Sequence, residues 1–256
     1  QAEDGIRACL LSRGLGDVYK RQSVIISSVV PTLTDIVKLS CNDMLCENIY
    51  IVRASSVKRV NVSIDNINEI GTDLLSNAVE GSSMYDDNVV VVDFGTALTF
   101  TVISKNKDVL GVNIVPGLKT AINSLYKNTA NLPVIDLKIP EKVIGKNTVH
   151  SIQSGIMHGY VGLVKEILSK IKDELVGDTK VIATGGLSKF AEPLKVEFDD
   201  IIPTLTLDGM IKILEDYEDE GSLSDAQILR LRRLRRRVCD ACGRQGTLEE
   251  ERFPVC

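Results

Sequence analysis

A turn between two apolar segments carries residues suited to holding a phosphate and a cation. Residues 88–93 (NVVVVD) predict a buried strand that ends in an acid, and residues 98–104 predict a second strand. The intervening D-F-G-T runs from Asp93 to Thr96. A carboxylate at a strand end can hold a cation, Gly95 lets a phosphate approach the backbone, and the Thr96 hydroxyl and amide can bond a phosphate oxygen. The alternative is a plain hairpin turn.

A second glycine-containing turn follows another apolar strand. Residues 180–183 predict this strand, which leads into Thr184, Gly185 and Gly186 and then a helix. Paired glycines at such a turn allow the sugar or phosphate of a nucleotide to lie against bare backbone. A tight turn without a ligand is the alternative.

The two turns lie about 90 residues apart, and together they resemble the actin-like ATPase superfamily, whose members bind nucleotide between two ribonuclease H-like domains. Further motifs resemble one family of that superfamily, type III pantothenate kinase, in order and spacing from about residue 27 to residue 217. They are IGTDL (70–74), VVVDFGTALTFTVI (90–103), GVNIVPG (111–117), TANLP (129–133), IGKNT (144–148), SG (154–155) and ATGG (183–186).

The resemblance implies a role for each matching residue. Asp73 corresponds to the catalytic aspartate that accepts the proton of the pantothenate hydroxyl, and a carboxylate at a helix start suits that task. The implied substrate-binding residues are Gly71, Thr72, Asp73, Leu74 and Thr148. The implied ATP-binding residues are Gly95, Thr96, Thr184, Gly185 and Gly186, and Asp93 is the implied ligand of a monovalent cation. An ordinary helix cap is the alternative for Asp73.

The same resemblance implies the reaction and the partners. It implies ATP-dependent phosphorylation of pantothenate to 4′-phosphopantothenate, the first committed step of coenzyme A synthesis, by a cytoplasmic homodimer. Mg²⁺ and K⁺ or NH₄⁺ are the implied cofactors. Phosphoryl transfer needs positioning and charge neutralisation, which the motif residues can supply. With no Trp and 4% aromatic residues, a base-stacking nucleic-acid platform is not expected, and no membrane-spanning run is present.

Three departures from the family pattern leave alternatives open. Leu74 stands where the family commonly has Arg, and Ile64 stands where it commonly has Tyr. The family's D-x-G-N-T phosphate loop has no counterpart before Ser27, so we expect a truncated and poorly active chain. A non-catalytic relative that influences transcription is therefore the second hypothesis. A zinc-dependent interaction protein is the third hypothesis, and it rests only on two cysteines near the carboxyl end, Cys239 and Cys242.

The pattern predicts an α/β fold of two ribonuclease H-like subdomains, the first incomplete, over residues 23–87 and 88–220. Strands are expected at 24–30 and 49–52, and helices at 73–79, 117–128, 149–175 and 208–217. The helix over 149–175 carries Gly155, Gly159 and Gly162 on nearly one face. Each glycine disfavours a helix by about 1 kcal/mol, which predicts close packing against a neighbouring backbone.

Composition separates two flanks from this middle. Residues 23–220 hold 16 Lys and two Arg, whereas residues 1–22 and 221–256 together hold 11 Arg and one Lys. We expect residues 1–22 to be a non-native leader, with an ordinary disordered amino terminus as the alternative, and residues 221–256 to be a basic tail. Cys239 and Cys242 form a C-x-x-C that resembles half of a zinc finger. The net charge of −5 conceals −9 in the middle segment.

Overall fold

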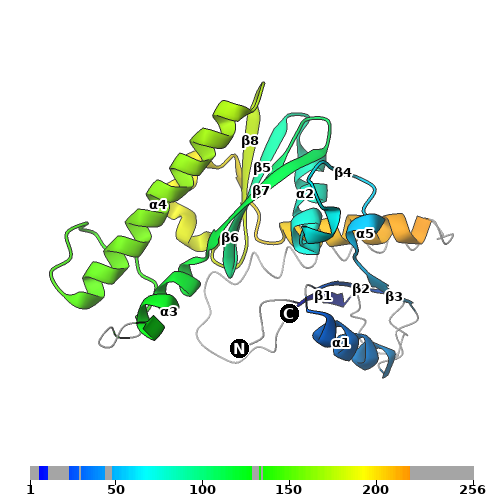
Figure 1. The fold of residues 1–256 in the computed structure, drawn as a ribbon, viewed down its shortest axis with the longest axis horizontal. Coiled ribbons are helices and arrows are strands. Elements are labelled where there is room, and N and C mark those ends of the chain that lie inside the picture. The colour runs from blue at the N-terminus through cyan, green and yellow to red at the C-terminus, as the bar shows by residue number, and fades with distance from the viewer. Residues whose placement is uncertain are drawn as a thin grey trace, which may run out of the picture. The chain divides into compact units, whose positions relative to one another are not determined.

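The computed structural model describes residues 6–10, 23–28, 30–43, 48–128, 133 and 135–219 (Figure 1). These residues fall into two compact units. Unit 1 takes its described residues from 1–60, 65–80 and 206–256, and unit 2 takes its own from 61–64 and 81–205. Within the described part of the chain, no helix is both long and apolar enough to cross a membrane.

Unit 2 is built on a mixed sheet. Its six described strands, given in their order across the sheet, are β4 (Asn61–Val62), β7 (Asp108–Pro116), β6 (Ala97–Ile103), β5 (Asn88–Phe94), β8 (Thr179–Thr184) and β9 (Asp200–Ile201). Strand β6 is antiparallel to both of its neighbours, whereas β5, β8 and β9 are mutually parallel. The order β7-β6-β5-β8-β9 with these directions is that of the ribonuclease H-like fold. The expected α/β fold is thereby confirmed in unit 2.

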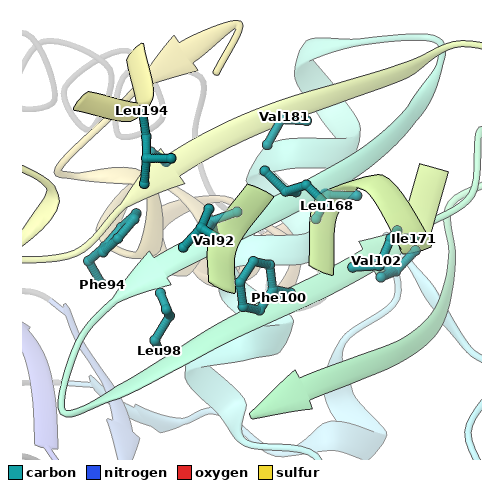
Figure 2. Close-up of a cluster of buried hydrophobic side chains, with 12 residues drawn as sticks. Val92, Phe94, Leu98, Phe100, Val102, Leu168, Ile171, Val181 and Leu194 are labelled. Atoms are coloured by element: carbon teal, nitrogen blue, oxygen red, sulfur yellow. The ribbon is translucent and has the colours of Figure 1, made fainter. Parts of the chain in front are cut away.

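One face of this sheet is covered by the long helix α4 (Thr148–Glu174), which runs along it in Figure 1. Val164, Leu168 and Ile171 of α4 belong to the same buried cluster as Val92 and Phe100 of the sheet. Figure 2 shows how the ring of Phe100 and the branched side chains around it fill the space between helix and strands. Burial of this apolar surface is the main stabilising contribution to unit 2.

The other face of β5 is also covered, which explains its unbroken valines. Helix α2 (Thr72–Met84) reaches unit 2 with its last turn, and there Gly81 lies against the sheet. A β-carbon at Gly81 would stand 3.0 Å from Val91 Cγ2 and 3.3 Å from Val89 Cγ1. Every residue of β5 is buried. The buried strand predicted over residues 88–93 is confirmed, and the structure covers it on both faces.

Unit 1 contains a small sheet in the order β1 (Ile6–Leu10), β2 (Ser23–Ser28) and β3 (Asn48–Ile51). Strands β2 and β3 are parallel and joined by helix α1 (Pro31–Asp43), as a β-α-β connection requires. Val24, Ile26 and Cys41 are buried together between them. Two short 3₁₀ helices follow, at Ala54–Ser56 and Ile67–Glu69.

Helix α5 (Leu205–Asp219) joins unit 1 through α2, although the sequence placed it in the second subdomain. The Thr206 hydroxyl donates to Asn77 Oδ1 at 2.6 Å, and Lys212 pairs with the buried Glu80 at 2.8 Å. These contacts join positions well over a hundred residues apart. Strand and helix patterns do not predict such pairings, so the boundary expected at residue 88 differs from the division observed.

Part of the expected leader has regular structure, at Ile6–Leu10. This segment forms β1 and pairs antiparallel with β2, in a register that places Ile6 opposite Ser28 and Leu10 opposite Val24. A segment of five residues is too short for an alternating pattern to be recognised in the sequence. Its strand conformation is stabilised by pairing with β2 rather than specified by its own side chains.

The close packing expected along the glycines of α4 is not made by the described residues of this chain. Gly155, Gly159 and Gly162 are exposed, and a β-carbon at any of them would meet nothing within 4 Å. The buried stripe of α4 is formed instead by Met157, Val164, Leu168 and Ile171 together with Ser154. The glycines therefore lie on the opposite, open side of the helix.

Candidate functional site

The D-F-G-T segment forms a tight hairpin turn between β5 and β6. The strands pair from Val89 with Ile103 up to Phe94 with Leu98, and the Gly95 N–H donates to the Ala97 carbonyl at 3.1 Å. The predicted strand-turn-strand is confirmed. Gly95 is half-buried and the Thr96 side chain is exposed.

The backbone of this turn is fixed by the start of α3 (Leu118–Asn128). The Thr96 carbonyl accepts hydrogen bonds from the Gly117 N–H at 2.8 Å and from the Thr120 hydroxyl at 2.7 Å. A β-carbon at Gly117 would lie 2.3 Å from the Gly95 carbonyl oxygen and 2.4 Å from that of Thr96. Only glycine permits this approach. The start of α3 thus fixes the backbone of the turn, while Thr96 itself remains exposed.

The turn after β8 lies directly against Asp93. Strands β5 and β8 are parallel, with Asp93 opposite Thr184. Gly185 adopts a φ of 94°, and a β-carbon there would lie 2.3 Å from Asp93 Oδ1 and 2.8 Å from the backbone of Phe94. The Leu187 N–H also donates to the Phe94 carbonyl at 3.1 Å. The structure therefore brings together two motifs that are about 90 residues apart in the sequence.

Past Gly185 the chain exposes Gly186 and continues as the 3₁₀ helix η3 (Ser188–Glu197), where the sequence predicted a helix. Asp93 retains 4% of its surface and Thr184 none. Burying a carboxylate is unfavourable unless charge and hydrogen bonds compensate it, and carboxylate oxygen is a ligand that hard cations prefer. The chemistry of Asp93 therefore fits the cation that the resemblance implies.

Asp73 belongs to unit 1 and begins the first turn of α2. Its Oδ1 accepts the Leu74 N–H at 2.9 Å. A β-carbon at Gly71 would lie 2.5 Å from the same oxygen, so the glycine leaves the space that the carboxylate occupies. The Ser27 and Thr72 hydroxyls share a hydrogen bond of 2.7 Å, which ties this turn to β2.

Leu74 contributes its backbone to this arrangement rather than its side chain. The side chain is 8% exposed and belongs to the apolar core, while the N–H holds the Asp73 carboxylate. A buried leucine cannot replace the charged group that the family pattern commonly has there. Ser27 of β2 also contacts this turn, through its hydrogen bond with Thr72. Sequence reasoning assigned it no role, because its partner is 45 residues away.

Thr148 lies in unit 2 at the first position of α4, where it is exposed beside an open pocket of about 710 Å³. Asn147 caps the helix by accepting the His150 N–H at 2.9 Å. Gly145 packs so closely on Ser151 that a β-carbon would lie 2.4 Å from its hydroxyl oxygen. The pocket is lined by Leu125, Gly145, Lys146, Asn147, Thr148, Ser151, Ile152, Gly155 and Ile156. Sequence reasoning missed Lys146 and Ser151, whose only signal was their proximity to Thr148.

The sequence-predicted site residues thus fall into separate groups. Asp93, Gly95, Thr184 and Gly185 lie together at one end of the unit 2 sheet, and Thr148 lines the pocket on α4. Asp73 is in unit 1. Cys239 and Cys242 lie outside the described residues.

The family model for type III pantothenate kinase matches residues 3–170, about two thirds of the chain. The chain belongs to the type III pantothenate kinase family. This match covers Asp73, Asp93 and Thr148, which carry the principal roles implied by the resemblance, and it includes β1 as well. A family of kinases transfers a phosphoryl group, and its members use ATP.

The solved structures that are similar to this chain include the following two. A Campylobacter jejuni protein described as a conserved transcriptional activator of the Baf family is 20% identical, with 78% of this chain and 86% of that chain covered and a TM-score of 0.48. MreB 5 of Spiroplasma citri bound to AMPPNP is 9% identical, with 83% and 74% covered and a TM-score of 0.42. With TM-scores below 0.5, neither bears on the activity of this pantothenate kinase family member.

Proposed function

We propose that this chain phosphorylates pantothenate with ATP to give 4′-phosphopantothenate. The observation that carries the proposal is the family match over residues 3–170, which includes an aspartate held in a defined orientation at the start of α2. ATP with Mg²⁺ supplies the phosphoryl group. The protein's own residues orient the substrates, receive a proton and balance charge.

In this proposal Asp73 accepts the proton of the pantothenate hydroxyl. A general base must have a fixed carboxylate within reach of the hydroxyl, and Oδ1 is fixed by the Leu74 N–H and by the space at Gly71. The first turn of α2 lies at the positive end of the helix dipole, an environment that suits a carboxylate. The half-buried position of Asp73 leaves part of its side chain accessible to a substrate.

The nucleotide is assigned to the two turns that meet at Asp93. The half-buried Gly95 and the exposed Gly186 bring bare backbone to the surface at this end of the sheet, and the exposed Thr96 hydroxyl can bond a phosphate oxygen. The contacts from Gly117 and Thr120 hold the Thr96 backbone in place. A preorganised turn of this kind can bind phosphate without first paying the entropy of ordering a loop.

Pantothenate is assigned to the pocket beside Thr148. Lys146 offers an ammonium group for the substrate carboxylate, the Thr148 hydroxyl offers a hydrogen bond, and Leu125 and Ile152 offer apolar surface. This combination suits a small hydroxylated acid.

We also propose that the chain forms a homodimer through the open side of α4. Gly155, Gly159 and Gly162 leave that side bare, and large apolar side chains nearby in the sequence are exposed, with Val143 at 65% and Ile144 at 80%. Glycines allow a second backbone to approach closely. The packing that the sequence predicted for this face is thereby proposed for a second copy.

The first experiment is titration calorimetry of pantothenate, followed by detection of the phosphorylated product. We expect the wild-type chain to bind pantothenate and Thr148→Val to bind it more weakly. Thr179→Val is the matched control, because Thr179 follows the far end of α4, and a helix of 27 residues is about 40 Å long. Absence of pantothenate binding by the wild-type chain would contradict the proposal and favour the non-catalytic relative, a hypothesis that rests on Leu74 and Ile64.

A further inference from the structure

Three polar side chains form one row across three neighbouring strands at one end of the unit 2 sheet. Asp93 of β5 is paired with Thr184 of β8 on one side and with Thr99 of β6 on the other. Residues directly opposite each other on neighbouring strands point to the same face, with β-carbons about 4.5 to 5.5 Å apart. The carboxylate therefore lies between two hydroxyl groups on one face of the sheet.

Both hydroxyls are buried in a way that calls for a ligand. Thr184 is fully buried and Thr99 is 8% exposed. Neither Thr184 Oγ1 nor Thr99 Oγ1 has a hydrogen-bond partner among the described residues. Buried polar atoms are normally satisfied, and leaving them unsatisfied is unfavourable. Two such oxygens next to a buried carboxylate form a set of oxygen donors that a cation would satisfy.

The composition of the row favours a monovalent cation. It carries one negative charge, from Asp93, and two neutral hydroxyl oxygens, so a single positive charge balances it. Ca²⁺ in proteins takes about six to eight oxygen ligands, commonly including several carboxylates, whereas this row offers a single carboxylate. K⁺ and NH₄⁺ both suit neutral oxygen donors.

We propose that the hydroxyls of Thr99 and Thr184 bind the monovalent cation together with the carboxylate of Asp93. The proposal rests on the proposed function only for the cation at Asp93. It gives Thr184 a cation-binding side chain in place of the nucleotide contact expected from the sequence, and it adds Thr99, to which the sequence analysis assigned no role. The row lies where β5 and β8 enter the two turns assigned to phosphate, so the cation would sit beside the negative charge it offsets.

The same strand provides a matched control. Thr101 lies two residues further along β6 on the same face, is fully buried, and also has an Oγ1 without a hydrogen-bond partner among the described residues. Its cross-strand neighbour is Val91 rather than an acid. A hydroxyl in that row has no carboxylate beside it, so its removal should leave cation binding unchanged.

The test measures stabilisation of the full chain by the salt alone, with no nucleotide or pantothenate. Melting temperatures are recorded in increasing KCl, because an ion that binds only the folded state raises the melting temperature. Tetramethylammonium chloride keeps the ionic strength constant. We expect KCl to stabilise the wild-type chain. Thr99→Val and Thr184→Val should each weaken the apparent K⁺ affinity by about tenfold or more, whereas Thr101→Val should retain it.

Serine variants separate ligation from folding. Thr99→Ser and Thr184→Ser keep the hydroxyl and should keep the K⁺ response even if their melting temperatures fall. A wild-type K⁺ affinity in both valine variants, with loss of the response in Asp93→Asn, would overturn the assignment of the threonines. No response of the wild-type chain to KCl, or a response to MgCl₂ alone, would overturn the monovalent site. The proposed function is tested separately, by pantothenate binding.

Discussion

Gly71 and Asp73 are related by a contact that fixes the proposed catalytic group. A β-carbon at Gly71 would lie 2.5 Å from Asp73 Oδ1, well inside the distance that two such atoms tolerate. The oxygen is held there by the Leu74 N–H at 2.9 Å. Gly71 therefore sets the orientation of a carboxylate two residues away.

Gly71→Ala should displace the Asp73 carboxylate and lower kcat while the chain remains folded. The added methyl group meets the end of a side chain, which can rotate, rather than the backbone. A displacement of about 1 Å at a reacting group can lower the rate on the order of 100-fold. Initial rates and melting temperatures should be compared with Gly111→Ala, whose β-carbon would meet nothing within 4 Å. Equal rates for the two variants would show that Gly71 has no positioning role.

Gly185→Ala should destabilise the chain more than Gly177→Ala does. Both glycines have a positive φ, 94° and 98°, so alanine is strained at either position by about 1 to 2 kcal/mol. At Gly177 the nearest atom to the new β-carbon would be 3.9 Å away, whereas at Gly185 it would be 2.3 Å from Asp93 Oδ1 and 2.8 Å from the Phe94 backbone. Urea unfolding measures the difference. Equal losses would mean that the two turns are not in the close contact described.

The elements that the sequence predicted best are those whose patterns are purely local. The valine run of β5 and the hairpin at Gly95 were predicted because apolar continuity and turn residues are visible within a few positions. Strand β7 was not predicted as a strand, because its exposed and buried residues do not alternate. Helix α1 was not predicted, although Pro31 at its first position is a residue that favours helix starts.

In the candidate site, too, local motifs could be predicted from the sequence and contacts between distant segments could not. The D-F-G-T and T-G-G motifs could each be read from the sequence, but their contact depends on the parallel pairing of β5 with β8, which no local pattern specifies. Thr99 was not identified for the same reason, because only the register places it opposite Asp93. The glycines of α4 predict a closely packed neighbour, but the sequence does not specify whether that neighbour belongs to the same chain or to a second copy.

Gly159→Ala should raise the free energy of unfolding of the monomeric chain by up to about 1 kcal/mol. Gly159 lies within α4, is exposed, and its β-carbon would meet nothing within 4 Å, so the gain in helix propensity is not opposed by a clash. Chemical denaturation at low protein concentration gives this value. At higher concentration, analytical ultracentrifugation should show weaker dimerisation than in the wild type. Destabilisation at low concentration would contradict the open face described for α4.

The titration of Tyr85 tests the hydrogen bond between this residue and Asp200 of β9 in unit 2. A hydrogen bond from the Tyr85 hydroxyl to Asp200, with burial and the charges of Asp200 and Asp199, raises the pKa of Tyr85 to about 12. Because this pKa lies above the unfolded value of about 10, the stabilisation is complete below pH 10 and is lost as the pH rises towards 12. Absorbance titration of the wild type against Tyr85→Phe isolates the group. Asp200→Asn should lower its pKa towards 10, and an unchanged titration would contradict the hydrogen bond.

The most direct test of the central claim is the rate of pantothenate phosphorylation by Asp73→Asn. The assay supplies ATP, Mg²⁺ and K⁺ and measures 4′-phosphopantothenate by mass spectrometry, with Glu69→Gln as an acid-to-amide control four residues upstream. A general base contributes about 10² to 10⁴-fold, so we predict that Asp73→Asn loses at least about 100-fold in kcat, whereas Glu69→Gln keeps the wild-type rate. Full activity of Asp73→Asn would contradict the assignment of Asp73 as the proton acceptor.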